Sequence, residues 1–87
     1  MKKRFAFFYF FKKETTDRVK DAADQRVRYW KKLDPEFYMG GPFTDRSGGM
    51  IIFSSDDLLT ATETAMNDPF TVEGLHENRW IKEWFIK

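Results

Sequence analysis

Residues 4–12, with the sequence Arg-Phe-Ala-Phe-Phe-Tyr-Phe-Phe-Lys, restrict the fold more than any other part of the chain. Aromatic side chains favour β-strands, and neither glycine nor proline interrupts this run. Successive side chains point to opposite faces of a strand. Both faces are apolar here, with Phe5, Phe7, Tyr9 and Phe11 on one and Ala6, Phe8 and Phe10 on the other. Such a strand belongs to a sheet that is covered on both faces.

An apolar stripe at helical spacing predicts a helix over residues 16–33. The helix ends at Asp34-Pro35, because the residue before a proline avoids the helical region. A short strand over residues 36–39 follows, Gly40-Gly41-Pro42 turns the chain, and residues 43–48 form a polar hairpin loop. The stripe consists of Val19, Ala22, Ala23, Val27, Trp30 and Leu33.

The second half of the chain again alternates strands with a helix. Residues 49–53 form a third strand, Ser54 or Ser55 caps a second helix that ends at Asn67-Asp68-Pro69, and residues 75–86 form the last strand. The order β-α-β-β-α-β predicts one α+β domain over residues 1–87 with a ferredoxin-like fold, in which two helices cover one face of a four-stranded antiparallel sheet.

Two helices leave the other face of that sheet uncovered, although the strands over residues 4–12 and 49–53 are apolar on both faces. A second copy of the same sheet is the simplest cover, since closed two-fold pairs are the commonest oligomers. The sequence therefore predicts a homodimer through the sheet face. Aromatic residues make up 18% of the chain, an excess that also suits a ligand pocket.

Charge and composition argue against several classes of partner. The net charge of +1 gives no general attraction for nucleic acid or for an anionic membrane. No apolar segment approaches the roughly 20 residues of a membrane helix, so we expect a cytoplasmic protein. With one histidine and no cysteine, we expect neither a metal site nor a cofactor. The element order also occurs in RNA-recognition modules, but glycine, Met and Ile occupy the positions in residues 46–53 where bases would stack.

Four motifs in this order are similar to those of a known family: Tyr29-Trp30-Lys31-Lys32-Leu33, Gly40-Gly41-Pro42-Phe43-Thr44-Asp45, Gly48-Gly49-Met50-Ile51-Ile52, and Asn67-Asp68-Pro69-Phe70 with Gly74. The chain resembles the YCII-related family of dimeric α+β barrel proteins over nearly its whole length. The resemblance implies a homodimer with a pocket near the helix-sheet junction. It also implies a histidine three residues before the Tyr-Trp pair, acting with the aspartate of Asp-Pro-Phe. Some relatives are lyases or dehalogenases of ring compounds.

Arg26 occupies the position where the resemblance implies that histidine, while Asp68 is retained. Histidine exchanges protons near neutral pH, but arginine stays protonated and cannot act as a general base. A guanidinium can instead bind a carboxylate or stabilise an oxyanion. Arg26 also falls inside the apolar stripe of its helix. The alternative interpretation is structural: an ion pair with Asp68 or another acid, or a side chain that extends along its stem to solvent.

The other candidate residues each have a functional and a structural interpretation. Asp68 is the candidate catalytic acid or base, although an aspartate before proline is also an ordinary helix stop. Asp45 and His76 are candidate ligand-binding residues. Asp45 can equally form a turn, and His76 can equally be solvated at the start of the last strand.

These observations predict a protein that binds a small anionic or aromatic molecule between the first helix and the sheet. Arg26 would bind the anion. The alternative is a lyase, dehalogenase or isomerase acting on a small ring or carboxylated compound, with Asp68 as acid or base. A non-catalytic interaction protein without a pocket is a third hypothesis.

Overall fold

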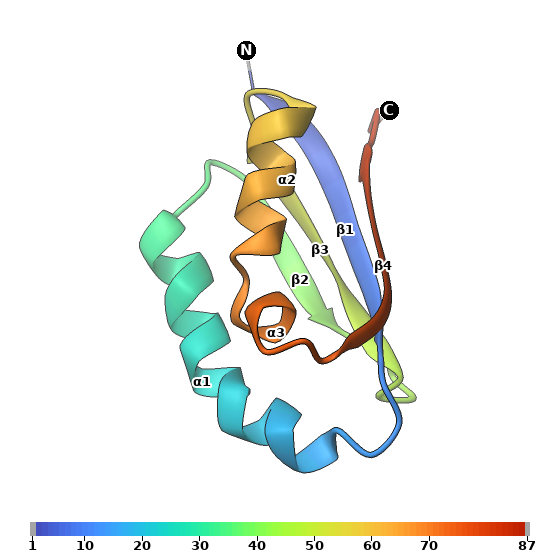
Figure 1. The fold of residues 1–87 in the computed structure, drawn as a ribbon. Helices are drawn as coiled ribbons and strands as arrows, with labels where there is room; N and C mark the ends of the chain where they lie inside the picture. The colour runs from blue at the N-terminus through green and yellow to red at the C-terminus, as the bar shows by residue number, and fades with distance from the viewer. Residues whose placement is uncertain (1, 87) are drawn as a thin grey trace.

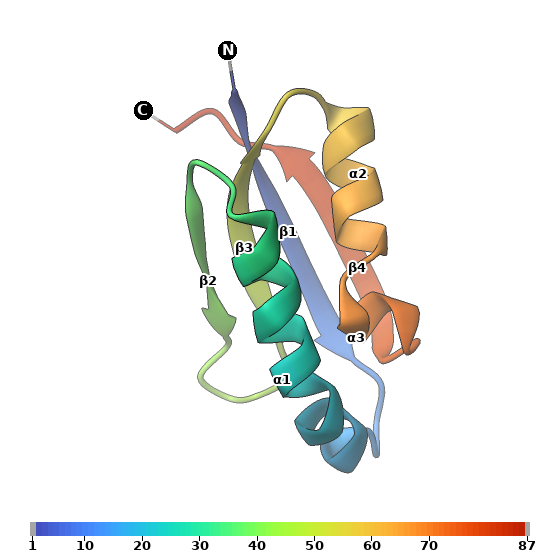
Figure 2. The same cartoon turned by 90° about the vertical axis from the view of Figure 1, so that its left-hand side faces the viewer.

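The computed structural model describes residues 2–86, which form an antiparallel sheet with helices on one face (Figure 1). The strands lie in the order β2-β3-β1-β4. They are β1 (Lys3–Phe11), β2 (Tyr38–Pro42), β3 (Gly48–Ser55) and β4 (His76–Glu83). The helices are α1 (Thr16–Leu33), α2 (Leu58–Met66) and α3 (Pro69–Val72), and Figure 2 shows all three on the same side of the sheet. The predicted α+β ferredoxin-like fold is confirmed.

The core lies between the sheet and the helices, and β1 supplies its centre. Phe5, Phe7 and Tyr9 are buried on the helical side, where Phe5 pairs in register with Phe53 and Phe7 with Ile51. The remaining buried apolar residues of this cluster come from the three helices and from the connection between α3 and β4, namely Ala22, Trp30, Ala61, Ala65, Phe70 and Leu75. The two faces of β1 assigned from the sequence are therefore the faces seen in the structure, where Phe5, Phe7 and Tyr9 form the buried one.

Helix α1 has the predicted bounds, but its apolar stripe is narrower than predicted. Asp34 adopts a left-handed conformation (φ 44°) and its backbone N–H bonds the carbonyl of Trp30, which ends the helix before Pro35. The prediction that Val27 and Leu33 belong to the stripe is wrong, since these residues are 65% and 46% exposed. The buried face of α1 is centred on Ala22 and Trp30 instead.

The predicted turn at Gly40-Gly41-Pro42 is wrong, because these residues belong to β2. The strand begins at Tyr38 rather than Glu36. Proline has no backbone N–H to donate, and an edge strand such as β2 tolerates it because the strand pairs on one side only. The chain turns after Pro42, before β3 begins at Gly48.

The start of α2 also differs from the prediction. Ser54 and Ser55 extend β3, and the helix is capped by Asp57, whose Oδ1 accepts a hydrogen bond of 2.8 Å from the backbone N–H of Thr60. After α2 the short helix α3 is an element that the sequence patterns did not predict. The last strand is shorter than predicted and covers His76–Glu83.

The second face of the sheet carries no helix among the described residues (Figure 2). Large aromatic side chains gather on it. The rings of Phe8 and Trp80 stack with their centroids 5.4 Å apart, and Phe10 lies against both Trp80 and Phe43. Trp80 is 44% exposed. We call this surface the open face. Its members come from three strands and one adjoining loop: Phe8, Phe10, Phe43, Met50 and Trp80.

A glycine at position 48 is required by the pairing of β3 with β1. A Cβ atom there would lie 1.9 Å from the backbone oxygen of Tyr9. Gly48→Ala should therefore lower the free energy of unfolding by about 3 kcal/mol or more, measured by urea denaturation. Gly41→Ala is the control, because its Cβ would meet nothing within 4 Å. A Gly48→Ala protein as stable as the control would contradict this account.

Candidate functional site

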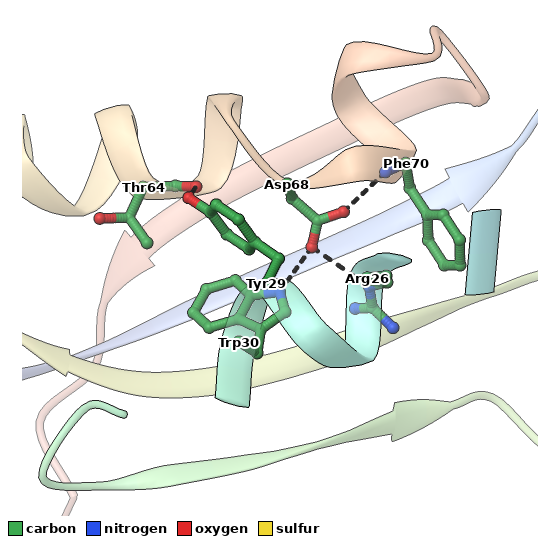
Figure 3. Close-up of polar contacts among 6 residues, drawn as sticks. All are labelled: Arg26, Tyr29, Trp30, Thr64, Asp68 and Phe70. Atoms are coloured by element: carbon green, nitrogen blue, oxygen red, sulfur yellow. Dashed lines mark hydrogen bonds and ion pairs between the residues drawn. The ribbon is translucent and has the colours of Figure 1, made fainter. Parts of the chain in front are cut away.

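The carboxylate of Asp68 is the centre of a buried polar network between α1 and α3 (Figure 3). Its Oδ2 accepts hydrogen bonds from the indole Nε1 of Trp30 at 2.6 Å and from Nε of Arg26 at 3.1 Å. Its Oδ1 accepts a bond of 2.8 Å from the backbone N–H of Phe70. Each oxygen of this buried anion therefore has at least one donor, which a charge away from water requires.

Local sequence explains how these groups converge. Arg26 and Trp30 are four residues apart on α1, so their side chains lie on one face of the helix. Asp68 is the N-cap of α3, and Pro69 occupies the first helical position, where its fixed φ angle favours helix initiation. The carboxylate turns back onto the N–H of Phe70 as an N-cap does.

A second polar link joins α1 to α2. The hydroxyl of Tyr29 donates a hydrogen bond of 2.6 Å to the backbone oxygen of Thr64, in the last turn of α2 (Figure 3). That oxygen also accepts a longer bond of 3.3 Å from the backbone N–H of Asn67, the C-cap residue of α2, and the hydroxyl supplies a shorter second bond. Partial burial raises the pKa of Tyr29, which keeps the hydroxyl a donor.

Arg26 is held firmly but is not fully satisfied. Its side chain is only 14% exposed, and its Cζ lies 4.6 Å from the ring centre of Phe70 and 5.2 Å from that of Tyr9. The Nε atom pairs with Asp68, as the structural interpretation of the sequence required. The Nη2 atom is buried and finds no hydrogen-bond acceptor among the described residues. A buried unpaired donor of this kind costs about 1–3 kcal/mol, and more on a charged group.

His76 is buried rather than solvated, and lies beside the same aromatic rings. Its imidazole stacks on Tyr9 with centroids 4.5 Å apart, and the rings of Phe7, Phe11 and Phe70 surround it at 5.9, 6.0 and 6.5 Å. Neither ring nitrogen has a hydrogen-bond partner among residues 2–86. Burial lowers the pKa of His76 to about 4, and although Asp68 opposes this shift, the imidazole is neutral at pH 7.

Asp45 stays within its own exposed loop. Its Oδ1 accepts hydrogen bonds from the hydroxyl of Ser47 at 2.7 Å and from the backbone N–H of Ser47 at 3.0 Å. These bonds lower the pKa of Asp45. The part of the chain that the structure describes gives Asp45 no bond to Arg26, Asp68 or His76, so the structure brings together three of the four candidate residues.

Two hollows flank the network, and Arg26 lines neither. A hollow of about 250 Å³ lies beside α1 and is lined by Arg18, Asp21, Ala22, Gln25 and Glu73. A smaller one of about 150 Å³ lies between the end of α1, the end of β3 and α2, with Trp30 and Phe53 in its wall. Trp30 therefore separates this second hollow from Asp68. Within residues 2–86 no three His, Asp or Glu side chains gather as a metal ion would need.

Trp30 is the residue of the site that the sequence assigned to the apolar stripe of its helix without a polar role. The spacing of Trp30 four residues after Arg26 was the available signal, since it places the indole N–H beside the guanidinium on one helix face.

No helix in the described part of the chain has the length and apolar character needed to cross a lipid bilayer.

Replacing the buried carboxylate tests how far the network supports the fold. Asp68→Asn puts an amide where three donors converge, and it should lower the free energy of unfolding by about 3–5 kcal/mol in chemical denaturation. Asp45→Asn removes a carboxylate from an exposed loop and should cost less than about 1 kcal/mol. Equal effects of the two substitutions would mean that the network does not hold the helices.

Comparison with known proteins agrees with this fold. A model of the YCII-related domain matches residues 4–85. The uncharacterized protein YjpA of Bacillus subtilis (strain 168) is 41% identical over 49 residues, which are 56% of this chain and 56% of that protein. The match therefore spans only a little over half of that relative.

Two solved structures share the fold at low sequence identity. One is 5-chloro-2-hydroxyhydroquinone dehydrochlorinase (TftG) from Burkholderia phenoliruptrix AC1100 in complex with 2,5-dihydroxybenzoquinone, with a TM-score of 0.84, 21% identity, and coverage of 94% of this chain and 93% of that one. The other is a dimeric ferredoxin-like protein of unknown function from Thermobifida fusca YX, with a TM-score of 0.59, 12% identity, and coverage of 99% and 92%. The family match spans nearly all of the sequence, and the chain belongs to the YCII-related domain family.

Proposed function

We propose that this protein binds a small aromatic anion at Arg26, between α1 and the sheet. The observation that carries the proposal is the buried Nη2 of Arg26, a charged donor without an acceptor in the described chain. A carboxylate or ionised hydroxyl would supply that acceptor with a strong, charge-assisted hydrogen bond.

The surroundings of Arg26 suit a planar ligand. The pairing of Nε with Asp68 fixes the orientation of the guanidinium, so little further side-chain entropy is lost on binding. Phe70 and Tyr9 flank the guanidinium and offer apolar contact to a ring. The hollow lined by Ala22 and Gln25 lies beside the turn of α1 that precedes Arg26, and we propose it as the side from which a ligand approaches.

The ligand of one solved neighbour supports this ligand class. TftG was solved with 2,5-dihydroxybenzoquinone, a single ring whose hydroxyl groups are conjugated to carbonyls and ionise like those of acids. It is therefore a planar anion of the kind that a guanidinium between aromatic rings would accept.

Binding is better supported than catalysis by Asp68. The alternative function is a lyase, dehalogenase or isomerase in which Asp68 exchanges a proton with a small ring or carboxylated compound. Asp68 is fully buried and both its oxygens already accept hydrogen bonds, so it would first have to lose Trp30, Arg26 or the N–H of Phe70. An anion bound at Nη2 of Arg26 would leave the three hydrogen bonds of Asp68 in place.

Titration with benzoate and 2,5-dihydroxybenzoquinone at pH 8 tests the proposal. Removal of Arg26 alone would leave Asp68 buried and unpaired, so the variant of choice is Arg26→Met combined with Asp68→Asn. Its affinity for both compounds should fall about 10- to 100-fold, because this is what the loss of one hydrogen bond to a charged group costs. Arg28→Gln is the control, since Arg28 is an exposed arginine on the same helix. Unchanged affinity in a folded double variant would reject Arg26 as the binding residue.

We also propose that the protein is a homodimer whose two open faces pack together. Phe8, Phe10 and Trp80 form a continuous aromatic surface that is opposite to the helices. Such a surface is costly in water, and an identical surface on a second copy covers it with two-fold symmetry. The ferredoxin-like neighbour from Thermobifida fusca is dimeric, which supports a dimer of this fold.

A charge in the middle of the open face should separate the subunits. Trp80→Asp should convert a dimer to a monomer at micromolar concentration, measured by sedimentation velocity, because an unpaired carboxylate cannot be buried between two apolar sheets. Leu59→Asp is the control, because Leu59 is an exposed apolar residue of α2, on the helical side. A wild-type monomer at this concentration would contradict the proposed dimer.

A further inference from the structure

His76 is a polar side chain in a place that suits an apolar one. It is 5% exposed, it touches the rings of Phe7, Tyr9, Phe11 and Phe70, and both its nitrogens lack partners among the described residues. Burying an unpaired polar atom costs about 1–3 kcal/mol, whereas a phenylalanine in this aromatic surrounding would carry no such cost. Packing alone therefore does not account for this histidine.

His76 and Arg26 are joined through shared aromatic neighbours. The ring centre of Tyr9 lies 4.5 Å from that of His76 and 5.2 Å from Cζ of Arg26. Phe70 contacts both residues as well, at 6.5 Å from the imidazole and 4.6 Å from the guanidinium. A change of charge at one of the two groups is therefore felt at the other across a short, water-excluded distance.

The charged groups around His76 come from three elements. Arg26 on α1 and Arg79 on β4 disfavour a positive imidazole, while Asp68 at the start of α3 favours it. Tyr9 on β1 is neutral, because burial raises the pKa of its hydroxyl to about 12. Asp68 is already paired with Arg26, so positive charge is in excess around the imidazole.

We propose that an anion bound at Arg26 is taken up together with a proton, which goes to a ring nitrogen of His76. The bound anion offsets the charge of Arg26, and the imidazole then gains more from the nearby negative charges than it loses by protonation. The proton comes from solvent and no other bond forms or breaks. By linkage, a more acidic solution must strengthen anion binding. This inference rests on the proposed function, and it narrows the ligand class to small aromatic acids that remain ionised in mildly acidic solution.

The test uses benzenesulfonate, whose charge does not change between pH 5.5 and pH 8. Calorimetric titration in two buffers of different ionisation enthalpy gives both the affinity and the number of protons taken up. At pH 5.5 the wild-type protein should take up a fraction of a proton per ligand and bind about fivefold or more tightly than at pH 8. His76→Phe should show no proton uptake and one affinity at both pH values.

Two further measurements keep the result unambiguous. Circular dichroism at each pH establishes that the proteins are folded, and His76→Gln, which keeps hydrogen-bonding atoms without a titrating group, should behave as His76→Phe does. Two results would overturn this inference and leave the proposed function standing. One is binding at pH 8 that depends on Arg26 but brings no proton uptake at pH 5.5. The other is equal proton uptake by the wild type and the His76 variants. Absence of binding to the wild type at both pH values would overturn both.

Discussion

The carboxylate of Asp68 lies out of contact with water, and an ionised group in that position must take its donors from the protein. Those donors come from α1, through Arg26 and Trp30, and from the backbone of α3, through Phe70. The same side chain is the N-cap of α3. The position of α1 over the sheet and the start of α3 therefore depend on one residue. Arg26 supplies the compensating charge, and loss of any of the three donors leaves the buried carboxylate with one hydrogen bond fewer.

An arginine at position 26 changes what this site can do chemically. A guanidinium holds its proton at all physiological pH values, so it provides a fixed charge and a directed set of donors rather than proton exchange. The proton-exchanging group of our proposals is instead His76, at the start of β4. Our proposals thus assign the fixed positive charge to Arg26 on α1 and the exchange of a proton to His76 on β4. Tyr9 lies between them in contact, and Gly49 admits its hydroxyl, since a Cβ there would lie 2.6 Å from that oxygen.

The parts of the structure that were predicted correctly are those in which one physical signal dominates. The double apolar alternation of β1 and the helical spacing over α1 each have a single interpretation, although the buried stripe of α1 is narrower than predicted. An ion pair with Asp68 was one of the structural interpretations of Arg26, and the structure contains that pair. The predicted turn at Gly40-Gly41-Pro42 failed because an edge strand tolerates these residues as a loop does. The hydrogen bond from Trp30 and the burial of His76 depend on side-chain rotamers and on tertiary packing, which spacing along one chain does not determine.

The residues that meet at Asp68 are far apart along the chain. Arg26 precedes it by 42 residues and Trp30 by 38, so β2, β3 and all of α2 are synthesised before Asp68 can meet α1. During synthesis, α1 has no partner for its guanidinium until the start of α3 leaves the ribosome. Contacts between residues so distant carry the entropy cost of closing a long loop. The attachment of α1 to Asp68 is accordingly a late step in the folding of the chain during synthesis.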